Sequence, residues 1–211
     1  MESNELLLAW GCGWAASRGT SQPQPLGGGA WRIEVGLPGH RSRDLLPAWD
    51  VERLQAWAAG IERPGTWIKA LVDPAELQLP PLWQRHATEY LMSTPLRPEA
   101  IPALAAGYRG ELVQGSDTLD YIVHAASSDI AAKARVGLSD GYAIFDQVVT
   151  DPAHRRLGLG RHAMTQLSLA AQARGADTGV LVATEDGRAL YSAMGWRVDS
   201  LMTAASVGEE A

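Results

Sequence analysis

The sequence VVTDPAHRRLGLGRH, which spans residues 148–162, decides how the rest of the chain is read. A strand-like segment ends at Thr150, and Pro152 turns the chain. Gly158 and Gly160 then lie at the start of a helical segment. Glycine lets a backbone pass close to a ligand because it has no Cβ. The unpaired N–H groups of a helix's first turn and the helix dipole favour an anion there. The stretch therefore predicts a cradle for a pyrophosphate.

Three arginines support this interpretation. Arg155, Arg156 and Arg161 place three positive charges within seven residues of a chain whose formal net charge is −6. The alternative is an ordinary turn with solvated arginines. The acidic balance of the whole chain argues against general nucleic-acid binding, because that function needs a basic face. The expected partner is therefore a small polyanion and no nucleic acid.

The segments around this turn alternate between strand-like and helix-like patterns. Residues 139–141, Ser-Asp-Gly, are typical of a tight hairpin turn between two strands. Leu159, Ala163 and Leu167 share one face of the helical segment, and Gly175 is a natural end for it. The order of elements predicts an α/β (α+β) fold, with a mixed, mostly antiparallel sheet flanked by helices. The predicted strands are 119–125, 131–138, 142–150, 178–183 and 196–202, and the predicted helices are 159–174 and 185–194, the second capped by Thr184.

The first half of the chain has a less regular pattern. A seam is predicted near residues 93–98, and it divides a domain at 1–97 from one at 98–211. Seven of the eight tryptophans lie in the first half, so they either fill its core or line an aromatic substrate pocket. The predicted helices are 5–17, 51–61 and 81–92, and the predicted strands are 31–35 and 66–72.

Composition narrows the class of protein. With 211 residues, 46% of them hydrophobic, the chain can bury a sizeable core. Cys12 is the only cysteine, which excludes an internal disulfide, and the five histidines lack the spacing of a metal site. The apolar runs fall short of the roughly 20 residues of a membrane span, and the acidic segment 1–5 is unlike a signal peptide. We therefore expect a cytoplasmic protein without metal or membrane contact, as a monomer or a homodimer.

Two kinds of anion-binding loop compete for the turn. Residues 158–163 satisfy Gly-x-Gly-x-x-Ala, the dinucleotide-binding fingerprint. That fingerprint places its glycines directly after a strand, whereas residues 151–157 intervene here. A phosphate loop with Gly-Lys-Ser/Thr is absent from the sequence. A dinucleotide-binding protein therefore stays only as a remote alternative.

A second family fits the chain in more places. Residues 155–160, Arg-Arg-Leu-Gly-Leu-Gly, match the Arg/Gln-x-x-Gly-x-Gly/Ala signature of the GNAT superfamily of acetyl-CoA-dependent N-acyltransferases. Residues 187–196, GRALYSAMGW, resemble that family's Ala-Leu-Tyr-x-x-x-Gly-Phe/Trp segment. The motifs occur in the family's order, and the resemblance covers about residues 100–206. It implies a GNAT-like acyltransferase fold.

The resemblance also implies roles for individual residues. Acetyl-CoA, or another acyl-CoA, would be the co-substrate, with its pyrophosphate on the amides of the turn and its pantetheine arm beside the preceding strand. The backbone N–H of Val149 would stabilise the oxyanion of acyl transfer, and Tyr191 would protonate the departing thiolate. For Tyr191 the competing interpretation is a packed aromatic side chain. The implied cofactor-binding residues are Val148, Val149, Thr150, Arg155, Arg156, Leu157, Gly158, Leu159, Gly160 and Arg161.

The general base has no single candidate. Some relatives that modify proteins carry a glutamate close to the position of Ile144, whose side chain takes no proton. Asp146 lies two residues further on the same strand face and is the preferred candidate, and His124 is another. A structural role is the alternative for each, and a water chain could deprotonate the amine instead. His154 and His162 are expected at the surface or beside the phosphate.

These observations predict an enzyme, an N-acetyltransferase that moves an acetyl group from acetyl-CoA to a primary amine by direct attack. We expect a small molecule or an amino acid as the acceptor, while a protein N-terminus or lysine stays open. The alternative from another class is a non-catalytic acyl-CoA-binding module. The first half lacks Arg-x-x-Gly-x-Gly, so we expect it to complete the sheet or wall the acceptor site, as a degenerate copy of the fold.

Overall fold

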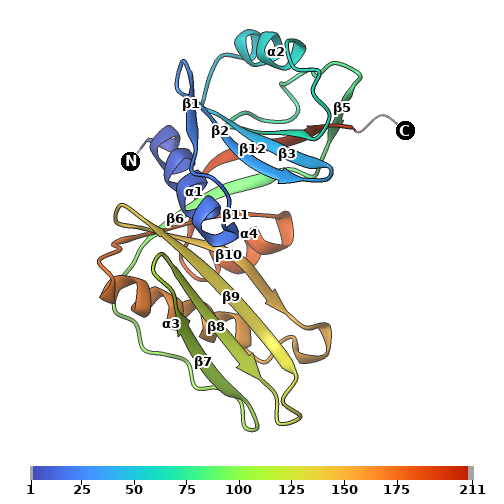
Figure 1. The fold of residues 1–211 in the computed structure, drawn as a ribbon. Helices are drawn as coiled ribbons and strands as arrows, with labels where there is room; N and C mark the ends of the chain where they lie inside the picture. Colours follow the sequence, from blue (N-terminus) through green and yellow to red (C-terminus); the bar gives the residue numbers. More distant parts are fainter. Residues whose placement is uncertain (1, 209–211) are drawn as a thin grey trace.

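The computed structural model describes residues 2–208, which form one twelve-stranded sheet and four α-helices (Figure 1). The strands are β1 (Gln24–Gly27), β2 (Ala30–Leu37), β3 (His40–Leu46), β4 (Thr66–Ala70), β5 (Trp83–Arg85), β6 (Glu89–Pro95), β7 (Arg109–Gln114), β8 (Thr118–His124), β9 (Ile130–Ser139), β10 (Tyr142–Thr150), β11 (Thr178–Ala183) and β12 (Arg197–Val207). The helices are α1 (Ser3–Arg18), α2 (Val51–Ala59), α3 (Leu159–Ala173) and α4 (Glu185–Ser192), with a 3₁₀ turn at Pro152–His154.

The sheet has the order β1-β2-β3-β4-β12-β6-β11-β10-β9-β8-β7, and β5 pairs with β12 beside this path. Among the described strands, the parallel pairs are β3 with β4 and β10 with β11. The other pairs are antiparallel, for example β9 with β10 and β6 with β11. The predicted mixed, mostly antiparallel sheet flanked by helices is thus confirmed.

Strand β12 lies in the middle of the sheet and pairs with strands on both sides of it. Its residues 197–202 pair with β6, whereas residues 203–206 pair with β4. Residues 205–207 also pair with β5. The register with β6 shifts between Val198 and Ser200, a bulge of the kind that bends a strand. A single bent strand therefore joins the strands β1 to β4 to those around β10 and β11.

Helices cover both faces of the sheet. α3 packs on one face against β8, β9 and β10, where its residues Leu159, Ala163 and Leu167 are buried, as the sequence pattern predicts. α1 crosses the other face against β9, β10 and β11. The side chains of β10 alternate between these cores, with Ile144 facing α1 and Phe145 facing α3. Within the described chain, no helix combines the length and the apolar character needed to cross a membrane.

Glycines let α1 lie unusually close to the sheet. An added Cβ at Gly137 of β9 would lie 1.9 Å from the carbonyl oxygen of Gly13 in α1, so the two backbones are in direct contact. An added Cβ at Gly13 would lie 2.6 Å from the Ile144 side chain. The predicted division of the chain at residue 98 stays a prediction. The structure adds that α1 and β6, which precede it, pack on or pair with β9, β10 and β11, which follow it.

Most of the predicted elements are confirmed. Residues 119–125, 131–138, 142–150 and 178–183 are strands, and 159–174 is a helix, within one or two residues at each end. Asp140 and Gly141 both have positive φ, 43° and 83°, as the predicted Asp-Gly hairpin turn requires. The last strand is longer than predicted, since β12 continues to Val207. In the first half, the predicted segments 5–17, 31–35, 51–61 and 66–72 correspond to α1, β2, α2 and β4.

The predicted helix at 81–92 is wrong, because these residues form β5 and the start of β6. β6 lies between β12 and β11, so neighbouring residues face opposite cores and both are buried. Leu91 lies in the core beside α1 and Met92 in the core beside α3. The segment has only these two adjacent buried apolar residues, and so short a run does not distinguish a strand from a helix.

Candidate active site

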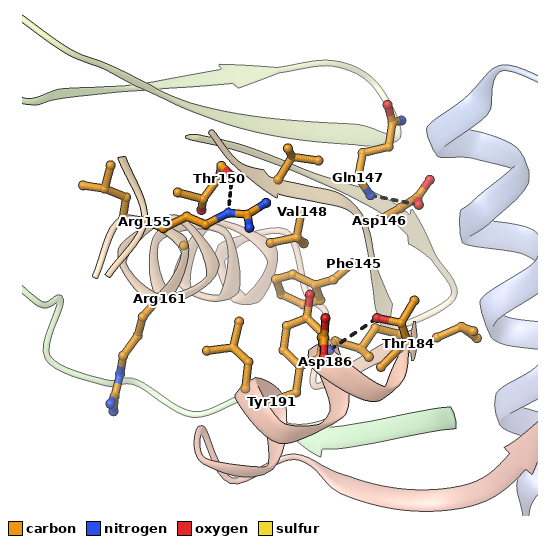
Figure 2. A pocket seen from close by; sticks show the side chains of 18 of the residues that line it. Phe145, Asp146, Gln147, Val148, Thr150, Arg155, Arg161, Thr184, Asp186 and Tyr191 are labelled. Carbon is orange, nitrogen blue, oxygen red and sulfur yellow. Dashed lines mark hydrogen bonds between the residues drawn. The ribbon is translucent and has the colours of Figure 1, made fainter. Parts of the chain in front are cut away.

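Strands β10 and β11 diverge and leave an opening in the sheet. Their parallel register covers Tyr142 to Ile144 of β10, although both strands continue beyond it. A cavity of about 800 Å³ lies where they separate (Figure 2). Its wall includes Phe145, which faces α3, and Asp146, which contacts α1. Residues that face opposite sides of the sheet therefore line the same cavity.

The structure brings nearly all predicted site residues to this cavity. Asp146 and Tyr191 line it, together with nine of the ten residues expected to bind the cofactor. The exception is Leu157, whose side chain is 46% exposed outside the lining. Residues that the sequence analysis did not single out also line the cavity, namely Phe145, Gln147, Leu181, Val182, Ala183, Thr184, Asp186, Gly187 and Leu190.

A β-bulge shapes the β10 side of the cavity. The register between β10 and β9 shifts between Asp146 and Val149, and Gln147 has a positive φ of 53°. A bulge interrupts the ladder and changes the direction of the side chains around it. Val148 packs against the core beside α3, while the side chain of Val149 is 52% exposed. Gln147 and Val149 therefore lie on the cavity wall with backbone that departs from a regular strand.

The turn between β10 and α3 has the backbone of a close-approach site. Arg156 has a φ of 62°, and Gly158, which precedes α3, has a φ of 74°. Glycine has no side chain with which to cap a helix, so the first-turn N–H groups remain available to a ligand. An added Cβ at Gly160 would lie 3.3 Å from the Thr150 hydroxyl oxygen. The exposed side chains of Arg155 and Arg156 add positive charge at this end of the cavity. Figure 2 shows Arg155 beside Thr150.

Tyr191 is held in the opposite wall by α4. The Thr184 hydroxyl caps this helix by accepting a hydrogen bond from the N–H of Gly187 at 3.3 Å. The Tyr191 ring lies 6.0 Å from that of Trp196 and only 9% of the residue is exposed. Burial, and after it the charge of Asp146, raise the pKa of Tyr191 to about 12. The phenol is therefore protonated at neutral pH and can donate a hydrogen bond.

Asp146 is tied to the N-terminal helix α1. Its carboxylate accepts two hydrogen bonds from the Arg18 guanidinium, at 2.6 and 3.0 Å, and one from the Ser17 hydroxyl at 2.8 Å. The N–H of Gln147 donates a further one at 2.9 Å. Burial alone would raise the pKa of Asp146, but these donors lower it below its ordinary value. No local pattern in the sequence indicates this pairing, because α1 and β10 are far apart along the chain.

Two of the histidines singled out from the sequence, His124 and His162, lie outside the cavity lining. His124 on β8 faces Glu111 at 3.5 Å and lies outside the cavity lining. His162 is buried, which contradicts its predicted place at the surface or beside the phosphate. Its ring nitrogens lie 2.9 Å from the Tyr121 hydroxyl and 2.6 Å from the carbonyl oxygen of Pro102. Residues 2–208 contain no group of three His, Cys, Asp or Glu side chains placed like metal ligands.

A polar contact links β6 to α4, the helix that carries Tyr191. The carboxylate of Glu185 accepts a hydrogen bond from the hydroxyl of Tyr90 on β6 and pairs with Arg188 one turn along α4. The Arg188 guanidinium also lies over the Tyr90 ring, 4.9 Å from its centroid. This contact is possible because α4 directly follows β11, and β11 is the neighbour of β6 in the sheet.

The opened parallel pair and the glycine turn at the start of α3 agree with the GNAT-like fold that the two sequence motifs imply. The family model described as the Acetyltransferase (GNAT) family matches residues 84–196. The chain belongs to this family.

Solved structures share the fold over most of the chain. A GCN5-related N-acetyltransferase from Kribbella flavida aligns with a TM-score of 0.62 at 15% identity, and the alignment covers 98% of this chain and 96% of that one. One from Sphaerobacter thermophilus aligns with a TM-score of 0.58 at 12% identity, covering 86% and 78%. A GCN5-related N-acetyltransferase-like protein from Streptococcus suis gives a TM-score of 0.56 at 14% identity, covering 84% and 83%. Such low identities show the fold alone. No curated protein matches the sequence significantly.

Proposed function

We propose that this protein is an N-acetyltransferase that moves an acetyl group from acetyl-CoA to a primary amine of a small molecule. The observation that carries the proposal is one cavity in which the open β10–β11 pair, the turn at Gly158 and the phenol of Tyr191 meet. In the reaction the amine nitrogen bonds to the thioester carbonyl carbon and the carbon–sulfur bond breaks. The amine loses one proton to water, and the departing thiolate takes up one from water.

The residues of the cavity fit an acyl-CoA as donor. A pyrophosphate needs N–H donors and positive charge, which the first turn of α3 and the exposed Arg155 and Arg156 supply. The extended pantetheine arm suits the part of β10 beyond Ile144, because an extended chain can pair with a strand edge that lacks a neighbour. The volume of about 800 Å³ is within the usual range of ligand pockets.

Tyr191 and the bulge supply the groups that acyl transfer needs. The backbone N–H of Val149 is our candidate donor to the carbonyl oxygen, because a fixed N–H needs no reorganisation as charge develops. Tyr191 is our candidate donor to the departing sulfur. The pKa of Tyr191 is raised to about 12, above the roughly 8.5 of an ordinary thiol. The phenol therefore stabilises the thiolate chiefly through a hydrogen bond rather than by giving up its proton completely.

The contacts of Asp146 favour a water relay over direct deprotonation by this carboxylate. The lowered pKa of Asp146 makes it a weak base, and its oxygens already accept hydrogen bonds from Arg18, Ser17 and Gln147. The two routes are distinguished by Asp146→Asn. A direct base predicts a loss of kcat of roughly 100-fold or more, whereas a relay predicts a smaller change in a variant that still folds.

Two measurements test the proposed function. Calorimetric titration with acetyl-CoA, CoA and NAD should show saturable binding of the two coenzyme A species and none of NAD. A screen of amines, amino acids and peptides, followed by release of the free thiol, should then identify the acceptor. Binding without thiol release from any acceptor would favour a non-catalytic acyl-CoA-binding module. Binding of NAD in place of CoA would overturn the proposal.

A further inference from the structure

Arg43 is a buried arginine outside the cavity described above. It lies on β3, on the sheet face that α1 covers, and only 8% of the residue is exposed. Its guanidinium lies over two rings of α1, 4.0 Å from the centroid of Trp14 and 5.6 Å from that of Trp10. Its Nε is fully buried without a hydrogen-bond partner in residues 2–208. The two aromatic rings therefore contact the cation, while its Nε–H group has no hydrogen-bond acceptor among the described residues.

The charged neighbours of Arg43 are already paired with each other. Lys69 of β4 forms an ion pair with Glu89 of β6, and Arg18 of α1 forms one with Asp146 at 2.6 Å. Burial is the main cause that lowers the pKa of Arg43, to about 10, so the group is still a cation at neutral pH. A buried charge is costly unless an opposite charge meets it. Among these five residues, three are positively charged and two negatively charged, and the charge of Arg43 is the one without an opposite partner.

A second polar atom is unused beside the guanidinium. The buried Nε2 of His40 also has no hydrogen-bond partner among the described residues. The His40 ring lies 6.0 Å from that of Trp14 and 5.1 Å from that of Trp67. Burial, followed by the charges of Arg43 and Lys69, lowers the pKa of His40 to about 4. The ring is therefore neutral at neutral pH and can donate one hydrogen bond.

A chain of contacts links Arg43 to Asp146 in the cavity wall, on the side of α1. The ring of Trp14 lies under Arg43 and also 5.7 Å from the guanidinium of Arg18. Arg18 pairs with Asp146, which is part of the cavity wall. The turn at Gly158 is attached to α3, which packs on the opposite face of the sheet. The unpaired cation therefore lies on the face from which an acceptor, rather than the donor's phosphates, would approach.

We propose that Arg43, with the imidazole of His40 beside it, binds the carboxylate of the acceptor, so that the acceptor class is primary amines that carry a free carboxylate. This inference rests on the proposed function. A carboxylate supplies the single negative charge that the neighbourhood lacks, and its planar fork matches a guanidinium. The rings of Trp14 and Trp67 provide apolar walls on either side of the polar atoms. A phosphate carries more charge than one cation neutralises, so it is the comparison in the test.

The first experiment measures anion binding without any acyl transfer. The probes are sodium benzoate, its uncharged analogue benzamide, and inorganic phosphate at matched ionic strength, and the readout is the melting temperature. Benzoate should raise the Tm of the natural protein with a saturable dose dependence, whereas benzamide should not. The effect should disappear in Arg43→Gln. A benzoate effect that survives in Arg43→Gln, or a larger Arg43-dependent effect of phosphate, would overturn the proposal.

A matched control separates binding from the general loss of an arginine. Arg53 of α2 also stacks on a tryptophan, with its guanidinium 3.8 Å from the Trp49 centroid, but it is exposed and donates to the carbonyl of Gly28. Arg53→Gln should keep the benzoate effect. Should Arg43→Gln fail to fold, Arg43→Lys keeps the charge and loses the fork, and it should weaken the benzoate effect. An unchanged effect in Arg43→Lys would argue against bidentate binding of a carboxylate.

The second experiment measures acetyl transfer to 4-(aminomethyl)benzoate and to 4-(aminomethyl)benzamide. In the natural protein, kcat/KM for the carboxylate substrate should be at least tenfold higher than for the amide. A hydrogen bond to a charged group typically contributes more free energy than a tenfold change in binding requires. Arg43→Gln should lower the value for the carboxylate to that for the amide and leave the amide unchanged. Equal values for both in the natural protein would overturn the proposal. Failure of the chain to bind acetyl-CoA would instead refute the proposed function, and the benzoate experiment would still decide the anion site.

Discussion

Replacing Gly158 by alanine tests the anion cradle against a matched control at the other end of α3. Gly158 precedes the helix with a φ of 74°, and Gly175 follows it with a φ of 89°. At both positions an added Cβ meets no atom within 4 Å, so the two substitutions share the same local strain and lack a clash. An alanine at positive φ costs roughly 1–2 kcal/mol. For a chain of this length each variant should therefore lower the Tm by roughly 2–8 °C.

Only Gly158→Ala should weaken the binding of CoA. Its Cβ would stand where phosphate oxygens approach the N–H groups of the first turn, and Gly175 lies outside the cavity lining. A hydrogen bond to a charged group contributes about 1.5–3 kcal/mol. The loss of one such bond would therefore raise the Kd roughly 10- to 150-fold.

Calorimetric titration with CoA, well below the Tm of both variants, measures this difference. Gly175→Ala should bind CoA like the natural protein. Equal affinities in all three proteins would refute the assignment of the turn as a phosphate cradle. Equal losses in both variants would show that backbone strain, and not obstruction of the turn, controls the affinity.

Three further outcomes follow from the described contacts. Tyr191→Phe should lower kcat roughly 10- to 100-fold with an unchanged Kd for CoA, measured by thiol release, and a Kd that changes with kcat would argue for a packing role. Asp146 has a lowered pKa, so its ion pair with Arg18 stabilises the fold above about pH 4 and loses this effect as the pH falls through the folded-state pKa. Asp146→Asn should therefore reduce the free energy of unfolding at pH 7 and change it less at about pH 3, as urea denaturation would show. Arg43→Met should raise the Tm or leave it unchanged, because it removes an unpaired buried charge, whereas a clear drop would mean that the stacked guanidinium stabilises the fold.

The sequence predicts β8 and α3 from the alternation of buried and exposed positions along each element. Buried and exposed residues alternate along β8, and the buried positions of α3 recur at helical spacing. Both patterns can be recognised in the amino-acid sequence alone. The strand β6 is not predicted, because Leu91 and Met92 are its only adjacent buried apolar residues and so short a run does not identify a strand. The strand β3 is not predicted for another reason: its charged residues Arg43 and Asp44 are buried, and their composition is typical of a loop. Asp44 is tolerated there because Arg32 on β2 pairs with it at 2.7 Å.

The candidate site divides in a similar way. The proposed donor side depends on neighbours in sequence, so short motifs, the glycine turn and the segment around Tyr191, are enough to predict it. The proposed acceptor side depends on contacts between distant segments. Arg18 meets Asp146, Lys69 meets Glu89, and Arg43 stacks on Trp14 only because α1 crosses the sheet. The sequence could offer an aromatic pocket in the first half as an alternative, but it could not show which charged side chain lacks a partner.

The bent strand β12 also constrains when the protein can fold. Among the described strands, one edge of β4 pairs with β3, and the other edge, at residues 67–70, pairs only with residues 203–206 of β12. This second pairing cannot form until residues 203–206 have been synthesised. A ribosome therefore releases most of the chain before the early strands gain this neighbour, and their N–H and C=O groups stay available to other chains until then. We expect truncation after Met202 to leave β4 and β5 unpaired on that side and to favour aggregation over a smaller folded product.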